Sequence, residues 1–93
     1  MLGKVKTNRN RKYLDWVRTL PCCICGAEAE PHHIKGVGHY SGAGMKADDL
    51  LTMPLCHQHH EEIHDNPKAF NQERAVIRTI LIAMREGVLK WTT

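Results

Sequence analysis

The sequence predicts a small α+β domain that a bound metal ion holds together. Helix-like apolar patterns near both ends of the chain enclose two short strand-like segments. At 93 residues the chain supports one domain with little core of its own. It has two tryptophans, two tyrosines and one phenylalanine, against four cysteines and seven histidines. A metal ion is therefore the expected source of the stability that packing cannot supply.

The N-terminal part predicts a basic arm followed by a helix. Residues 1–9 are polar and aperiodic, so we expect a flexible arm ahead of a single domain at residues 10–93. In "RKYLDWVRTL" the apolar residues at helical spacing are Tyr13, Leu14, Val17 and Leu20. Pro21 ends this pattern, because proline cannot continue a helix.

The middle of the chain predicts two extended segments separated by a loop. "PCCICGAEAEPHHI" indicates a cysteine turn and then a strand that begins near Pro31. "KGVGHYSGAGMKADD" contains four glycines and is long enough to be a functional loop. "LLTMPL" indicates a second strand or an extended approach, and Pro54 then leads into a short helix that carries "PLCHQHHEEIH".

A long helix is expected near the C-terminus. Asn66 and Pro67 predict its N-cap and first position, and Gly87 predicts its end. An apolar stripe at helical spacing on this helix predicts core residues, namely Phe70, Ile77, Ile80, Leu81 and Met84.

The distribution of charge points to a phosphate-bearing partner. The net charge is only +3, but cations crowd the first 18 residues. A solvated disordered leader explains this crowding equally well. No segment approaches the roughly 20 apolar residues of a membrane span, and the first residues lack the apolar region of a signal peptide. We therefore expect a cytoplasmic protein that has no membrane partner.

Four residues predict a structural zinc site. Cys22 and Cys25 form one turn-like pair, and Cys56 and His59 form another, which is the ligand set of tetrahedral zinc. A redox role for the first pair would require a thioredoxin-like βαβ pattern, which is missing, and disulfides rarely persist in a reducing cytoplasm. Cys23 is left over and is expected to be a small buried apolar residue.

The remaining histidines predict a second site. His60 and His64 are four residues apart, the spacing by which a helix offers two imidazoles to one metal ion. His32 and His33 are the other concentrated donors, so one could bind the ion while its neighbour serves as a general base. Both reach one cleft only if the strand is twisted or kinked, because neighbouring strand residues face opposite ways. His39 and His57 are expected to be ordinary surface or core residues.

These motifs resemble the HNH endonucleases of the ββα-metal (His-Me finger) class. The match spans about residues 20 to 65, with "HHIKGVG", "GMKADD" and "PLCHQHHEEIH" closest to small phage and prophage nucleases related to the phage recombination-enhancement endonuclease. The resemblance implies a ββα-metal core with a zinc knuckle, flanked by an N-terminal helix and a long C-terminal helix. It also implies a bacterial host cell.

The resemblance also implies residue roles. His33 would be the general base, and His32, His60 and His64 would bind a catalytic Mg²⁺ or Mn²⁺, with Zn²⁺ or Ni²⁺ as alternatives. The implied reaction is hydrolysis of DNA phosphodiester bonds. The family usually has an asparagine behind the general base. Here the candidates are Asp48 and Asp49, of which we assign Asp49 to the site.

The implied partner is double- or single-stranded DNA, which a recombinase filament could coat. The residues predicted to contact DNA are Lys4, Lys6, Arg9, Arg11, Lys12, Lys35 and Lys46. The alternative function is a zinc-stapled DNA-binding module without catalysis, and a zinc scaffold for protein contacts is a third. A second, exchangeable divalent site would distinguish the enzyme from both.

Overall fold

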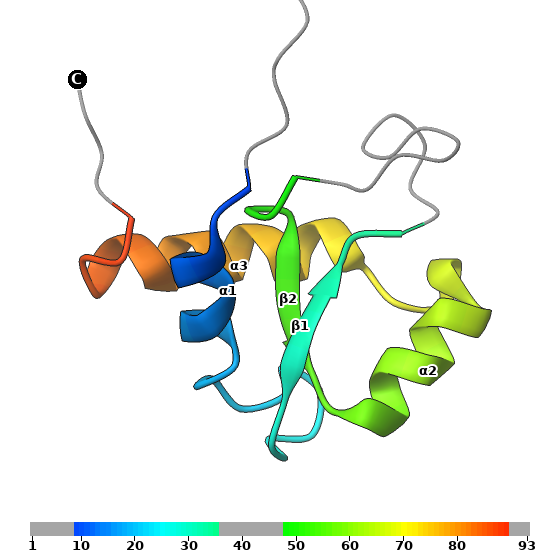
Figure 1. Ribbon diagram of the computed structural model, residues 1–93. Coiled ribbons are helices and arrows are strands. Elements are labelled where there is room, and N and C mark those ends of the chain that lie inside the picture. Colours follow the sequence, from blue (N-terminus) through cyan, green and yellow to red (C-terminus); the bar gives the residue numbers. More distant parts are fainter. Residues whose placement is uncertain (1–8, 36–47, 90–93) are drawn as a thin grey trace, which may run out of the picture.

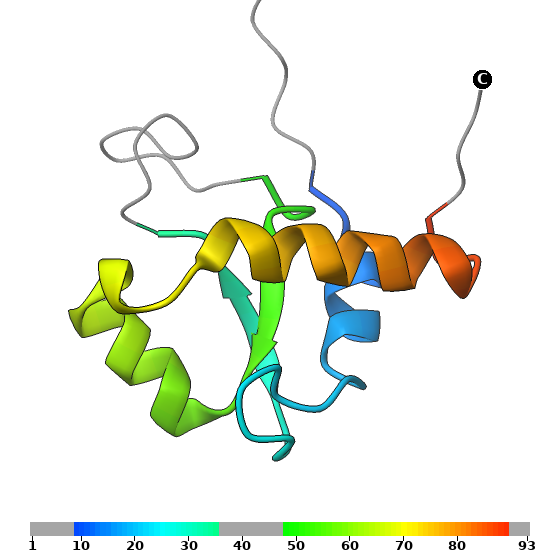
Figure 2. The same ribbon diagram turned by 180° about the vertical axis from the view of Figure 1, so that it is seen from behind.

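The computed structural model describes residues 9–35 and 48–89 and confirms a small α+β fold. In chain order the elements are α1 (Arg11–Val17), β1 (Glu30–His33), β2 (Thr52–Leu55), α2 (His57–Asp65), the 3-10 helix η2 (Pro67–Ala69) and α3 (Gln72–Arg85). Figure 1 shows α1 and α2 on either side of the strands and α3 behind them, and Figure 2 shows α3 from its outer side. Within these residues no helix has the length and apolar character needed to cross a bilayer.

The two strands form an antiparallel ladder that places the histidine pair of β1 beside the start of β2. In the register Glu30 faces Leu55, His32 faces Met53 and His33 faces Thr52. Every residue of β2 is buried, because α3 covers this strand from behind. The expected extended segments at Pro31 and in "LLTMPL" are therefore confirmed as strands.

The core has two parts, one on each side of β2. Around the sheet, Ile34, Met53, Leu55, Ile63 and Val76 pack together with the first cysteine of the knuckle. On the other side, Tyr13 and Val17 of α1 pack against Ala83 of α3, as the helical pattern predicted for α1. A core of this size is small, which is consistent with a need for a further stabilising element.

Tyr13 gives a prediction that tests the packing of α1. Its hydroxyl is buried without a hydrogen-bond partner among the described residues, and burial raises its pKa to about 12. Tyr13→Phe removes this unsatisfied group, so its free energy of unfolding should equal that of the wild type or exceed it by about 1 kcal/mol. Above pH 10 the unfolded chain ionises while the folded chain does not. Between pH 10 and about 12 the wild type should therefore lose stability relative to Tyr13→Phe in urea titrations. If the free energies of unfolding of the two proteins changed in parallel between these pH values, the buried state of the Tyr13 hydroxyl would be contradicted.

The long helix begins later than predicted. Asn66 and Pro67 start the short η2 instead, and the Asn66 side chain makes no capping hydrogen bond. The backbone becomes extended at Phe70, which separates η2 from α3. Asn71 is the true N-cap, since its side-chain oxygen accepts a hydrogen bond of 3.0 Å from the Arg74 backbone nitrogen. The predicted end is confirmed, with Gly87 at a φ of 77°.

The predicted core stripe of α3 is wrong at two positions. Ile77 and Leu81 are 59% and 48% exposed, whereas Phe70 and Ile80 do pack against the core and Met84 is half-buried. The buried face consists of smaller or polar residues, namely Gln72, Ala75, Val76, Thr79 and Ala83. Small side chains at four-residue spacing let α3 lie close to β2. The helix therefore turns this smaller face toward β2, which leaves Ile77 and Leu81 facing solvent.

Candidate metal centre and histidine site

The four predicted zinc ligands come together at one point of the fold. Cys22 and Cys25 lie in a turn that closes through hydrogen bonds from Gly26 N to Cys22 O and from Cys22 N to Ala27 O, each of 2.8 Å. Gly26 has a φ of 79°, a conformation that favours glycine. Cys56 is the N-cap of α2 and His59 lies in the first turn of that helix. The Cys23 backbone nitrogen donates to Pro54 O at 3.0 Å and ties this turn to β2.

The spacing of the ligand atoms fits tetrahedral zinc. The sulfur atoms of the three cysteines and one ring nitrogen of His59 all lie within 4.8 Å of one another. Cys25 Sγ is 3.7 Å from Cys56 Sγ, and His59 Nδ1 is 3.6 Å from Cys22 Sγ and 3.2 Å from Cys56 Sγ. Usual zinc bond lengths give tetrahedral edges of about 3.8 Å between sulfurs and about 3.5 Å between sulfur and nitrogen. The Cys22, Cys25, Cys56 and His59 cluster can therefore hold a metal such as zinc.

The surroundings of Cys22 favour its thiolate, which is the form that binds metal. Desolvation opposes ionisation, but backbone hydrogen bonds from Cys56, Cys25 and Ile24 and the contact with His59 outweigh it. Together they lower the pKa of Cys22 to about 6. Cys22 is therefore largely ionised at neutral pH even before an ion neutralises its charge.

Cys23 is outside this cluster, as predicted, but it is not buried. Its residue is exposed, whereas we expected a small buried apolar side chain. Partial desolvation of the thiol and the nearby Cys22 raise the pKa of Cys23 to about 11. A thiol with this pKa is a poor nucleophile at neutral pH.

His32 is a buried imidazole without a partner. It is 2% exposed, and neither ring nitrogen has a hydrogen-bond partner among the described residues. Its ring makes an edge contact with His60, with 4.5 Å between the ring centroids. Burial, assisted by the nearby His60, outweighs a weak contact with the Gln72 side chain and lowers the pKa of His32 to about 4. The ring is therefore neutral at physiological pH and keeps a lone pair that a metal ion could use.

The predicted ligands on α2 lie beside an open pocket of about 440 Å³. Its lining consists of Glu30, His57, His60, Glu61, His64 and Asp65. His60 Nδ1 is 2.7 Å from Glu30 Oε1, a close contact that lacks the geometry of a hydrogen bond. His64 Nε2 contacts the amino group of Lys35. His57 is exposed, as expected.

The three predicted ligands of the second ion do not form a closed cluster. Within the described residues, the Cys3His group is the only set of three or more such side chains whose ligand atoms are all this close together. His32 and His60 are in contact, whereas His64 is engaged with Lys35. A divalent ion at this site would require Lys35 to move away from His64.

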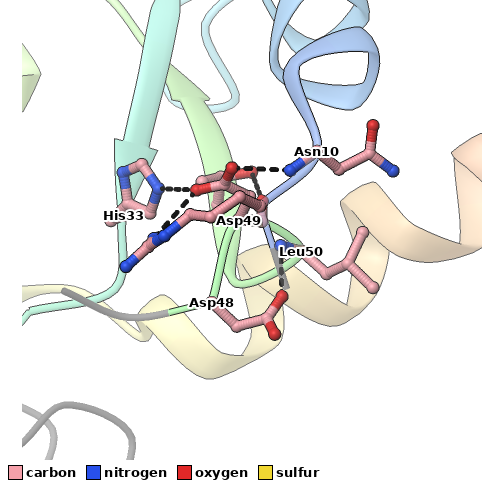
Figure 3. Close-up of polar contacts among 7 residues, drawn as sticks. Asn10, His33, Asp48, Asp49 and Leu50 are labelled. Carbon is pink, nitrogen blue, oxygen red and sulfur yellow. Dashed lines mark hydrogen bonds and ion pairs between the residues drawn. The ribbon is translucent and has the colours of Figure 1, made fainter. Parts of the chain in front are cut away.

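His33 is paired with a buried carboxylate. Figure 3 shows its ring directed at Asp49, with His33 Nε2 2.9 Å from Asp49 Oδ1. Asp49 is 5% exposed and also accepts hydrogen bonds from Asn10 N at 2.8 Å and Arg9 Nη1 at 3.2 Å. Burial opposes its ionisation, but these donors together lower the pKa of Asp49. Asp48 instead accepts from Leu50 N at 2.9 Å. Of the two aspartates, Asp49 is the one that contacts the predicted general base.

Adjacent strand positions send the two histidines in different directions. His32 is directed toward α2 and His33 toward Asp49, as expected for neighbours in a regular strand. The described residues include no non-glycine residue with a positive φ and no cis peptide bond that would kink β1. The expected shared cleft therefore does not arise from a kinked strand. The rings of His32 and His33 instead point in different directions from the carboxyl end of β1.

The predicted DNA-contacting residues divide into three groups. Lys4, Lys6 and Lys46, like His39, lie outside the described residues. Arg11 and Lys12 are exposed on α1. Arg9 was expected in a flexible arm, but it pairs with Asp49, and Lys35 lies at the histidine site.

Two residues at the site were missed by sequence reasoning. Glu30 lies two positions before His32, and strand periodicity could have placed it on the same face. Gln72 is buried at the start of α3, where its amide pairs with the backbone of Lys35 through bonds of 3.0 Å and 2.8 Å and also donates to Pro67 O. No pattern in the sequence indicates this, because glutamine is usually exposed.

Gln72 gives a second stability prediction. Gln72→Met keeps a similar volume but leaves the backbone groups of Lys35 and Pro67 without this partner, so it should lower the free energy of unfolding by about 2 kcal/mol. Gln58→Met changes an exposed glutamine on α2 and should alter stability by less than about 0.5 kcal/mol. Urea titrations measure both variants. Equal stabilities would show that the Gln72 amide does not anchor the end of β1.

Fold and site together define a small α+β protein with a Cys3His cluster that could hold a metal ion and a histidine-rich strand end. The chain belongs to the family described as "Protein of unknown function (DUF968)", which matches residues 2–87. It is 44% identical over 84 residues to "Uncharacterized protein YdfU" of Escherichia coli (strain K12). That match covers 84% of this chain and 24% of the relative, so the chain spans about a quarter of the relative's length. No solved structure matches the chain.

Proposed function

We propose that this protein is a metal-dependent DNA endonuclease of the HNH kind, with His33 as its general base. The observation that carries the proposal is the arrangement of two adjacent histidines. His33 is paired with the buried Asp49, while neither ring nitrogen of His32, which lies beside His60, has a well-formed hydrogen bond within residues 9–35 and 48–89. A histidine that a carboxylate orients is suited to act as a general base, and a buried imidazole with free ring nitrogens is suited to bind a metal ion. Neighbouring histidines of these two kinds are what the proposed mechanism requires. The order β1, β2, α2 supports a ββα-metal core.

The residues that would hold the catalytic ion are His32, His60 and His64. The neutral, unpartnered ring of His32 is the feature that fits a metal ion best, because a buried polar atom rarely lacks a partner. An ion held by these residues would supply Lewis-acid chemistry, namely polarisation of the scissile phosphate and stabilisation of the departing 3′ oxygen. Lys35, once displaced from His64, is placed to contact a phosphate of the substrate.

His33 acts on the water that attacks phosphorus. If the Asp49 carboxylate accepts a hydrogen bond from Nε2–H, the Nδ1 lone pair is left to take a proton from water. The negative charge of Asp49 then stabilises the imidazolium that forms, as the carboxylate does in a serine protease triad. Arg9 and the Asn10 backbone hold Asp49 in place, so the start of α1 supports the base.

The test is cleavage of plasmid and single-stranded DNA with Mg²⁺ or Mn²⁺, and with chelator. Wild-type protein should cut only with the divalent ion, and His60→Ala should lose this activity. Gln58→Ala is the matched control, because it removes an exposed side chain of the same helix that does not line the pocket, and it should retain activity. Cutting by His60→Ala at the wild-type rate would remove the proposed metal site.

A zinc-stapled DNA-binding module is the second candidate. It is favoured by the finding that the part of the chain described by the structure has one closed ligand cluster, since the Cys3His group alone would satisfy a structural role. Binding of DNA without cutting, and one tightly held zinc with no exchangeable second ion, would support it. A recombinase filament as partner stays a prediction from the resemblance.

A further inference from the structure

The solvent side of α3 carries an unusual combination of side chains. We use the name α3 outer stripe for its exposed residues Arg74, Ile77, Arg78, Leu81 and Arg85. At about 100° per residue these positions fall within an arc of about 100° on the helix surface. Ile77 and Leu81 are the two most exposed large aliphatic residues in the described part of the chain. An aliphatic patch between arginines is typical of a binding surface rather than of a solvated helix face.

The stripe borders a hollowed surface rather than a flat one. One hollow of about 250 Å³ is lined by residues of the knuckle, β2 and α3, including Pro21, Pro54 and Ile82. A second of about 340 Å³ lies toward the start of α3 and is lined by Phe70 and Arg74 among others. Both share Cys23, Ala75 and Arg78, so together they form one groove between α3 and the cysteine turn. Figure 2 shows this turn below α3 on the same side of the molecule.

The charge of the stripe is not neutralised within the described residues. Arg74, Arg78 and Arg85 form no ion pair there, whereas Arg9, Arg11 and Arg18 on the other side of the molecule each pair with an aspartate. Glu86, at the end of α3, accepts a hydrogen bond of 3.2 Å from the Trp16 ring nitrogen. Three guanidinium groups along one helix, without ion pairs among the described residues, favour a ligand that carries carboxylates.

We propose that the α3 outer stripe and its groove bind an amphipathic acidic segment of a partner protein. Aliphatic side chains of this segment would contact Ile77 and Leu81 and fill the groove, while its carboxylates pair with the three arginines. This is the helix-in-groove mode of recognition, in which apolar anchors supply affinity and charges fix the register. The proposal does not depend on the nuclease assignment.

Nucleic acid and a second copy of the chain fit the stripe less well. Its centre is aliphatic and it contains no aromatic ring on which a base could stack. The stripe also lies behind the sheet, whereas β1 with His33 lies in front, so a straight duplex at His33 would not reach it. A symmetric dimer through α3 would bring arginines of one copy against arginines of the other.

The experiment selects random 16-residue peptides on the folded, zinc-loaded full chain. Three preparations are compared: wild type, Ile77→Ser with Arg78→Glu, and Arg11→Glu as a charge-matched control on α1. Wild type and Arg11→Glu should enrich peptides with aliphatic residues at helical spacing and an excess of Asp and Glu. The double variant should lose this enrichment. Thermal melts and zinc content of all three confirm that the fold is retained.

The enriched peptides are then measured by fluorescence anisotropy, in parallel with a 20-base-pair DNA duplex. Peptide affinity should fall at least tenfold in the double variant, while its affinity for the duplex should stay within twofold of wild type. Three outcomes would overturn the proposal: no enrichment on wild type, enrichment of basic or neutral peptides, or a tenfold loss of duplex binding in the double variant. The last would make the stripe a DNA interface.

Discussion

Replacing Cys56 by alanine is expected to abolish zinc binding and unfold the domain at room temperature. Cys56 both supplies a ligand and begins α2, so its loss opens the cluster and releases the helix that carries His60 and His64. Structural zinc contributes roughly 10–16 kcal/mol to the folding of small zinc peptides, which matches or exceeds the roughly 5–15 kcal/mol stability of a whole domain. Zinc content per chain and circular dichroism during a thermal melt measure the effect.

The sequence offers a matched control for this substitution. Cys23→Ala changes a cysteine next to a ligand but outside the cluster, so it should keep one zinc per chain and a wild-type melting temperature. Treatment of the wild type with a strong chelator should reproduce the Cys56→Ala result. A folded, zinc-free Cys56→Ala protein would show that packing alone stabilises this chain, and the cluster would then lose its structural role.

Replacing His33 by alanine is expected to lower the rate of DNA cleavage by about 10²–10⁴-fold, the usual contribution of a general base. The ring is partly exposed and contributes little to the core, so zinc content should not change. The melting temperature should fall modestly, because the buried Asp49 loses one of its partners. Asp49→Asn should reduce the rate less, because the amide still contacts His33 but no longer stabilises its charged form. Single-turnover rates on a labelled duplex with saturating Mn²⁺ measure both effects.

Controls separate the loss of the base from a loss of structure. Asp49 is buried and accepts bonds from Arg9 and Asn10, so its variant must be compared by thermal melt before its rate is interpreted. Asp48→Asn alters the neighbouring carboxylate, which contacts Leu50 rather than His33, and should cleave at the wild-type rate. Metal-dependent cleavage that persists undiminished in His33→Ala would remove the proposed mechanism.

Local spacing was sufficient to predict the four side chains of the Cys3His cluster and most of the elements. The spacing of Cys22 and Cys25 is that of a knuckle, and Cys56 and His59 lie at the start of a helix. Each pair needs only one turn of backbone to converge, so the sequence was enough to identify all four side chains. The strand of the histidine pair and the helix after Pro54 follow from proline positions and periodicity. These features depend on contacts between residues close in sequence, which a pattern can encode.

The start of α3 could not be placed correctly by local signals. Asn66 followed by Pro67 is a proper helix-start signal, and it does begin a helical turn, but that turn is η2. Phe70 packs against the core with an extended backbone, so the long helix α3 begins only after this residue, with Asn71 as its N-cap. Tertiary packing also explains why Ile77 and Leu81 face solvent. The face of α3 with the smaller side chains is the one that contacts β2.

The sequence by itself determined the class of fold, the ligands of the Cys3His centre and the presence of a histidine pair opposite a histidine-bearing helix. Only the tertiary structure decided which way each histidine points, that Asp49 rather than Asp48 meets His33, that Gln72 anchors Lys35, and which side of α3 is left to solvent. The physical reason is separation along the chain. These contacts join residues 16 to 37 positions apart, and their formation depends on how whole elements pack rather than on any local pattern.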